Sequence, residues 1–73
     1  MGINDLKLNE EGIVIKVKAE DNIKRRLMDI GLVKGAKVKP VLINKNIRAY
    51  LIKGTVIGIR NKDTLNIEVN IWK

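Results

Sequence analysis

One stretch constrains the fold of this chain more than any other: residues 21–35, which read Asp-Asn-Ile-Lys-Arg-Arg-Leu-Met-Asp-Ile-Gly-Leu-Val-Lys-Gly. Ile23, Leu27 and Ile30 have the spacing of an apolar stripe along one face of a short helix. Asp21 is expected to cap that helix, because its carboxylate can accept hydrogen bonds from the free amides of the first turn. Such a short helix is marginal alone in water, so it must pack against the rest of the chain.

Glycines mark the end of this helix and the turns that follow it. Gly31 is expected just beyond the last helical residue, where a left-handed backbone costs glycine little, and Leu32 would then fold back onto Leu27 in a Schellman ending. Gly35 supplies the next turn, and Gly54 marks a tight reversal between later strands. We therefore assign these three glycines structural roles.

The rest of the chain has the composition and the alternation of short strands. Hydrophobic residues make up 45% of the sequence and aromatic residues only 3%, so the core must be built from Ile, Val and Leu, which favour strands. Strands are expected near residues 13–20, 36–43, 48–53, 55–60 and 65–71. Five short strands with one helix after the first predict a small all-β, antiparallel barrel.

Two positions in these strands carry specific expectations. In the first strand the alternation places Ile13, Ile15 and Val17 on the apolar face, and Val14 interrupts the polar one. Pro40 cannot donate a ladder hydrogen bond, so it should lie at an edge or a bulge.

Size and cysteine content set the broad class of the protein. At 73 residues we expect residues 1–73 to form a single domain that buries about 60% of the surface of its unfolded chain. The absence of Cys excludes disulfides and thiolate ligands. No apolar run approaches the roughly 18 residues of a membrane span, so we expect a soluble, intracellular protein.

The formal net charge of +7 is large for so small a domain. It suggests a polyanionic partner such as a nucleic acid, an acidic protein surface or a layer of anionic lipid headgroups. The alternative is that the lysines only keep a small barrel soluble and protect its strand edges. The charges are spread along the chain, which leaves both interpretations open.

The residue types present argue against an enzyme. The chain contains no His and no Cys, and it offers neither a nucleophile–base pair nor a Gly-rich phosphate loop. We therefore expect no catalytic residues and no cofactor. A metal could be held only by carboxylates and carbonyls, whereas Fe²⁺ sites usually add imidazole, so we also predict no preformed metal site.

The residues from Arg26 to Val38, which read Arg-Leu-Met-Asp-Ile-Gly-Leu-Val-Lys-Gly-Ala-Lys-Val, resemble the signature of the FeoA family. Members of this family are small cytoplasmic accessory proteins of bacterial ferrous-iron uptake. The resemblance continues through residues 54–60 and reaches Val69, so that it covers nearly the whole chain from Leu8 onward.

This resemblance implies an SH3-like barrel and a non-catalytic role beside FeoB, the membrane ferrous-iron transporter with a cytosolic GTP-binding domain. It also implies a cytoplasmic location, reaching the inner face of the membrane only through that transporter. Two alternatives stay open: a basic barrel that binds nucleic acid, and a stand-alone regulatory domain like that of iron-dependent repressors. The only aromatic residues, Tyr50 and Trp72, make a poor stacking platform for nucleic acid bases.

The docking surface expected for such an accessory protein is the exposed helix face together with the turn and strand that follow. Its residues are Arg25, Arg26, Met28, Asp29, Lys34, Lys37 and Lys39. The lysines of this set could converge at one rim with Lys45 and Arg48, or form a solvated edge. For two residues a structural role is favoured: Asp29 in an ion pair with Arg25 or Arg26, and Met28 at the edge of the core.

Overall fold

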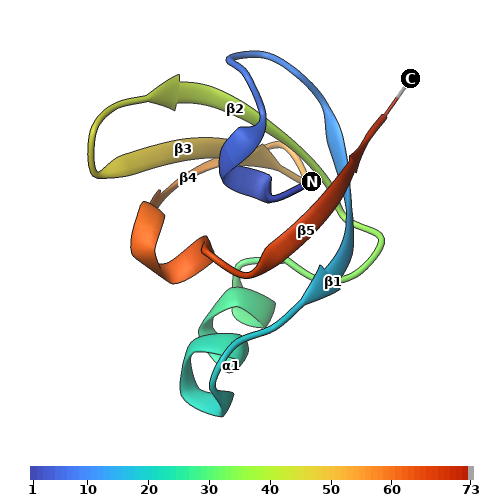
Figure 1. The fold of residues 1–73 in the computed structure, drawn as a ribbon, viewed down its shortest axis with the longest axis vertical. Helices are drawn as coiled ribbons and strands as arrows, with labels where there is room; N and C mark the ends of the chain where they lie inside the picture. The colour runs from blue at the N-terminus through green and yellow to red at the C-terminus, as the bar shows by residue number, and fades with distance from the viewer. Residues whose placement is uncertain (73) are drawn as a thin grey trace.

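The computed structural model describes residues 1–72, which form one five-stranded antiparallel sheet curved around an aliphatic core (Figure 1). The elements in chain order are η1 (Ile3–Asp5), β1 (Gly12–Val17), α1 (Asp21–Asp29), β2 (Lys37–Ile43), β3 (Ile47–Ile52), β4 (Thr55–Arg60), η2 (Asn61–Thr64) and β5 (Ile67–Ile71). The strand order is β4-β3-β2-β1-β5. The predicted five antiparallel strands with a helix after the first are confirmed.

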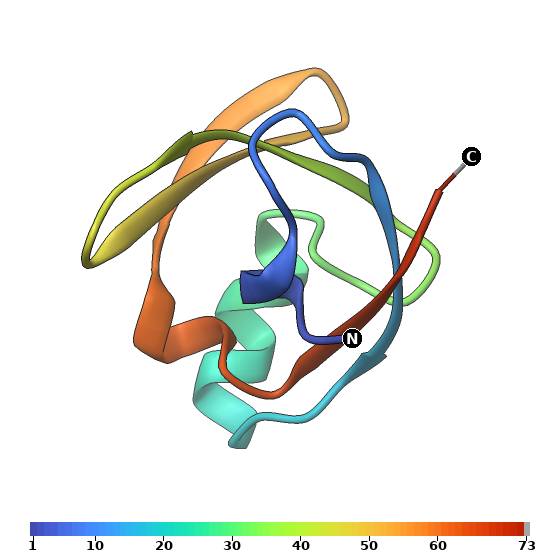
Figure 2. The same ribbon diagram turned by 45° about the horizontal axis from the view of Figure 1, so that its top comes forward.

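The sheet is left open between its two end strands. Within residues 1–72, β4 and β5 do not pair with each other, and η2 joins them along the chain. Figure 2 shows α1 on this open side, with η2 to one side of it and β1 to the other. The helix therefore plugs the gap that a closed barrel would not have.

All five strands and α1 contribute to one core, and so does the segment before β1. Ile3 and Leu6 of that segment are 0% exposed, so the N-terminal residues are part of the fold rather than a tail. The buried core consists of Ile3, Leu6, Val14, Leu27, Leu32, Ala36, Val38, Tyr50, Ile52, Ile59, Ile67 and Val69.

The end of α1 is the predicted Schellman motif. Gly31 has a φ of 90°, and its N–H donates to the carbonyl of Met28 at 3.0 Å. The N–H of Leu32 donates to the carbonyl of Leu27 at 2.9 Å. These two hydrogen bonds satisfy carbonyls that the helix end would otherwise leave free, and they bury Leu32 beside Leu27.

The start of α1 differs from the prediction. Asp21 is the first residue of the helix, and the capping position belongs to Glu20, which makes no side-chain cap hydrogen bond. The predicted Asp21 cap is therefore wrong by one residue. A carboxylate in the first turn still lies near the positive end of the helix dipole, which favours the same segment as a helix start.

The left-handed backbone at Gly31 gives a first prediction. Replacing Gly31 with Ala should lower the free energy of unfolding by about 1–2 kcal/mol, because an L-residue is strained at a φ of 90° and the new Cβ would lie 3.4 Å from Ile52 Cγ2. Urea unfolding followed by circular dichroism measures this. Gly58→Ala is the control, since a Cβ there meets only Ile47 Cγ2 at 3.7 Å and no loss of stability is expected.

β1 contains an irregularity that reverses the expected burial of its centre. Val14 pairs with Val69 and Lys16 pairs with Glu68, so Ile15 is an extra, bulged residue. Val14 is only 1% exposed, whereas Ile15 is 37% exposed. The expectation that Ile13 and Ile15 face the core is therefore wrong: Val14 and Val17 pack there, and the bulge between them shifts the alternation by one residue.

The turns and the proline of the sheet follow the prediction more closely. A register shift lies between Pro40 and Leu42, which places the proline beside a bulge as expected. Asn44 closes the β2–β3 turn by accepting from the N–H of Ile47 at 2.9 Å. Gly54, with a φ of 80°, forms the tight β3–β4 turn.

The buried hydroxyl of Tyr50 links the N-terminal segment to the sheet. The side chain of Tyr50 is 0% exposed, and its hydroxyl lies 3.4 Å from Asn4 Oδ1. Thr64 Oγ1 donates to the same Asn4 oxygen at 2.8 Å. Burial raises the pKa of Tyr50 above its usual 10.0, and the nearby Arg48 guanidinium opposes part of that rise.

This shift predicts the alkaline behaviour of the protein. The unfolded chain releases the Tyr50 proton near pH 10.0 but the folded chain retains it, so the contribution of Tyr50 to stability is complete below pH 10.0 and is lost as the pH rises through the raised value. Because the chain has a single tyrosine, tyrosinate absorbance reports this group alone. Absorbance that titrates at the ordinary value in the folded protein would contradict the prediction, and Tyr50→Phe is the blank.

Candidate docking groove

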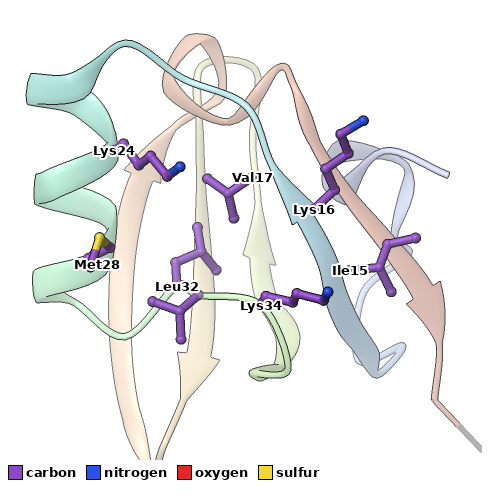
Figure 3. Close-up of a pocket in the computed structure, with 8 residues that line it drawn as sticks. Ile15, Lys16, Val17, Lys24, Met28, Leu32 and Lys34 are labelled. Carbon is purple, nitrogen blue, oxygen red and sulfur yellow. The ribbon is translucent and has the colours of Figure 1, made fainter.

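A groove of about 510 Å³ opens between α1 and β1 (Figure 3). Three separate parts of the chain form it: the bulged half of β1, one face of α1 and the loop after the helix. Its lining residues are Ile15, Lys16, Val17, Lys24, Met28, Leu32, Val33 and Lys34.

The groove combines an apolar floor with a basic rim. Figure 3 shows Lys24 reaching from α1 toward Val17 of β1, with Met28 at the edge of the same helix. Two further lysines, Lys16 and Lys34, lie on the β1 side and on the loop, and no acidic side chain lines the groove. Such a surface fits an apolar side chain whose neighbours carry negative charge.

The local structures described above create this groove. The bulge in β1 turns Ile15 outward, and the Schellman turn brings Leu32 back against the helix. Met28 is 57% exposed, so its favoured placement at the edge of the core is wrong. Ile23, Leu27 and Ile30 pack on the core from one face of the helix. Met28 lies on a different face, where its flexible apolar side chain is exposed to solvent.

The other predicted docking residues do not form one surface. Of the predicted set, Met28 and Lys34 line the α1–β1 groove. Arg26 lines a separate groove between α1 and β4, and Lys37 and Lys39 line a third on the sheet beside Leu51. Of the two interpretations left open for these lysines, their distribution over separate grooves favours a solvated edge over one basic rim.

Three further predicted residues have other environments. Arg25 is exposed on α1, and Asp29 lines a groove on the β3–β4 side of the helix. Within residues 1–72 the salt bridge that forms joins Arg60 Nε and Asp63 Oδ2 at 3.1 Å, so the ion pair favoured for Asp29 is wrong. Arg48 donates through Nη1 to the carbonyl of Leu6 at 2.7 Å. This hydrogen bond ties the N-terminal segment to the sheet, so the Arg48 guanidinium is not part of a basic docking rim.

Sequence reasoning missed Lys24, Ile15 and Lys16 as groove residues. Lys24 could have been found, because it precedes Met28 by four residues and so shares its helix face. The β1 residues could not, since only the pairing of β1 with β5 reveals the bulge that exposes them.

The described residues hold no cluster that suggests a metal site. In the part of the chain that the structure describes, acidic side chains never gather in groups of three or more that could hold a metal ion. Over the same residues, α1 and the short 3-10 helices are too short and too polar for any of them to cross a membrane.

Comparison with known proteins decides the family. The family model of the FeoA domain matches residues 1–71. This chain belongs to the FeoA family. A Campylobacter jejuni relative, provisionally named Fe(2+) transport protein A, is 31% identical over 74 residues, an alignment that covers 97% of this chain and 99% of that protein.

Solved structures of FeoA proteins have the same fold. The FeoA protein of Chlorobium tepidum is 32% identical with a TM-score of 0.92, over 100% of this chain and 71% of the other. Stenotrophomonas maltophilia FeoA, solved with zinc, is 26% identical with a TM-score of 0.81, over 96% of this chain and 89% of the other. The latter is described as a prokaryotic SH3 domain protein, so the predicted SH3-like fold is confirmed.

Proposed function

We propose that this FeoA-family protein is a non-catalytic accessory protein of ferrous-iron uptake that docks on the cytosolic face of a FeoB-type transporter through the α1–β1 groove. Family membership and the Campylobacter jejuni relative support the role in ferrous-iron transport. The Stenotrophomonas maltophilia protein, proposed as a ferrous iron transport activating factor, supports a regulatory role. Docking would hold the protein at the inner side of the membrane without inserting it.

The observation that carries the docking site is the exposed Met28 between two lysines. Met28 is 57% exposed although it belongs to a helix whose other apolar residues pack on the core. Lys24 lies one turn before it, and Lys34 lies across the groove. An apolar side chain of the partner would fill the groove while adjacent carboxylates meet these lysines, which gives both affinity and orientation.

Regulation by such a protein requires a preference for one state of the transporter. A bound accessory protein shifts a conformational equilibrium only by the difference between its affinities for the two conformations. The rigid α1–turn unit, held by its Schellman hydrogen bonds, offers a fixed shape that can discriminate between two arrangements of a cytosolic surface. No catalytic group or metal ion on this chain is needed for that effect.

The nucleic acid alternative is disfavoured by the placement of the aromatic residues. Tyr50 is 0% exposed and cannot stack on a base. Trp72 is 43% exposed, but Lys37 Nζ lies 4.2 Å from the centre of its ring. Trp72 is then the single exposed aromatic ring among the described residues, and the Lys37 ammonium lies against it. Single-stranded nucleic acids need several exposed rings in succession on which their bases can stack.

The test is to titrate isotope-labelled protein with the intact transporter in lipid nanodiscs and follow each amide by NMR. We expect signal loss at residues 15–17 and 24–34, with short RNA and with Fe²⁺ under anaerobic conditions causing none. If the transporter changed no amide signal while RNA shifted the Lys and Arg amides, the proposal would be contradicted and the nucleic acid alternative would be supported.

A further inference from the structure

A second apolar surface lies on the sheet, away from the α1–β1 groove. Residues directly opposite each other in antiparallel strands share a face, and neighbours along a strand alternate faces. Tyr50 and Ile52 point into the core, so the residues between and beside them point outward. The register places eight such residues of β2, β3 and β4 together, and we call them the outer face: Lys39, Leu42, Ile47, Ala49, Leu51, Val56, Gly58 and Arg60.

Six of the eight residues of the outer face are uncharged and non-polar, whereas a solvated sheet face would be mostly polar; Lys39 and Arg60 are the charged members. Val56 is 58% exposed, Leu42 49% and Ile47 41%. An antiparallel sheet with one wet face usually carries polar side chains there, and single exposed apolar residues are ordinary. A contiguous apolar patch across three strands instead indicates an interaction surface.

No described element covers this surface. α1 lies on the opposite side of the sheet, where a Cβ at Gly31 would meet Ile52 Cγ2 at 3.4 Å. Ile57, which pairs with Tyr50, packs against the core on that same inner side. The outer face and the α1–β1 groove are therefore separate, and two partners could occupy them at once.

The shape of the outer face suits a ridge on its partner. Gly58 lies opposite Ala49, and this pair of small residues is flanked by the larger Leu51–Val56 pair on one side and by the Ile47–Arg60 pair on the other. A Cβ added at Gly58 would meet only Ile47 Cγ2, at 3.7 Å. The pair thus forms the floor of a shallow trough, which a row of apolar side chains on a helix would fill.

The charges around the outer face select the partner. Lys37, Lys39 and Lys53 line a groove of about 170 Å³ beside Leu51, with Glu11 as its only acidic residue. Two copies of this chain packed face to face would bring two such sets of lysines to one interface, which disfavours a dimer. Arg60, opposite Ile47, adds a basic side chain at the other end of the trough. The trough over the small Ala49–Gly58 pair suits a ridge of side chains on a protein partner better than a flat lipid surface.

We propose that the outer face is a second docking surface, which binds an acidic amphipathic helix of a protein partner. The apolar side chains of that helix would lie over the Ala49–Gly58 trough, and its carboxylates would meet Lys37, Lys39 and Lys53. The chain then acts as a two-sided adaptor. This inference does not depend on the identity of the partner in the α1–β1 groove.

The probe is a synthetic helix of about 18 residues with Leu and Ala on one face and Glu on its flanks. Titrated into the labelled full chain, it should shift the amides of β2, β3 and β4. The same peptide with Lys in place of Glu should bind at least tenfold more weakly. No binding of the Glu peptide, equal binding of both peptides, or shifts confined to the α1–β1 groove would each overturn the proposal.

Two matched variants locate the site. Leu42→Glu should weaken peptide binding at least tenfold, whereas Leu65→Glu makes the same change at a leucine that is 68% exposed and lies outside the outer face, and should leave binding unchanged. Val56→Glu is a second test of the same kind. Leu42 and Val56 are both largely exposed, so either Glu variant should still fold. Equal weakening by Leu65→Glu would contradict the placement.

The other occupants of the outer face have their own readouts. Sedimentation that reveals a concentration-dependent dimer abolished by Leu42→Glu would replace the peptide partner with a second copy of the chain. Binding to vesicles of equal parts phosphatidylglycerol and phosphatidylcholine, lost in the same variant, would replace it with a membrane. Either result overturns the proposal.

Discussion

Leu32→Ala is expected to lower the free energy of unfolding by about 2–5 kcal/mol, the usual cost of truncating a fully buried leucine. Leu32 is 0% exposed, and its N–H closes the Schellman turn at the end of α1. A domain of 73 residues has a total stability of roughly 4–11 kcal/mol at typical values per residue. The variant should therefore unfold at a much lower urea concentration, or be partly unfolded without denaturant.

Leu65→Ala is the matched control for this measurement. Leu65 is 68% exposed, so the same truncation should change the free energy of unfolding by less than about 0.5 kcal/mol. Circular dichroism during urea titration measures both variants. If Leu32→Ala cost less than about 1 kcal/mol, the turn would not be the point at which the helix is fixed to the core.

The helix–turn unit was predictable because its signals are local. The apolar stripe, the left-handed Gly31 and the return of Leu32 onto Leu27 all lie within a few residues of one another. The same residues carry the family resemblance, so the fold and the family followed from one stretch. The Asp21 cap was wrong by a single position, a common error for helix ends.

The burial of β1 was not predictable from β1 alone. The alternation of Ile13, Ile15 and Val17 is regular in the sequence, but Val14 enters the core because it pairs with Val69. The extra residue of a bulge is defined by the partner strand, which lies more than fifty residues away along the chain. Pattern analysis of one strand therefore assigned the wrong face at its centre.

The candidate site was predictable only in part for the same reason. Met28 and Lys34 belong to the predicted docking set and do line the α1–β1 groove. Lys37 and Lys39 are close to Lys34 in sequence, yet they lie on β2 and line a different groove. Closeness in sequence failed here because a turn at Gly35 sends the chain into a strand on another side of the molecule.

Met28→Glu should weaken binding to the transporter by at least about 30-fold and leave the fold intact. Met28 is 57% exposed, so the substitution costs the free protein little. In the complex, however, it would bury a carboxylate on the apolar floor of the groove, at a cost of at least about 2 kcal/mol. A Glu at this position would also neutralise Lys24, one turn before it, and so repel an acidic partner.

The control and the salt dependence separate this groove from the outer face. Leu65→Glu adds the same charge at another exposed apolar residue and should not change transporter binding. Replacing Lys24 and Lys34 with Gln should slow association and flatten its dependence on salt, because these lysines attract the partner before contact. If Met28→Glu bound the transporter normally while Leu42→Glu did not, the outer face would be the transporter site and the groove would not. That result would contradict the proposed docking groove, because Met28 lines that groove whereas Leu42 lies on the outer face of the sheet.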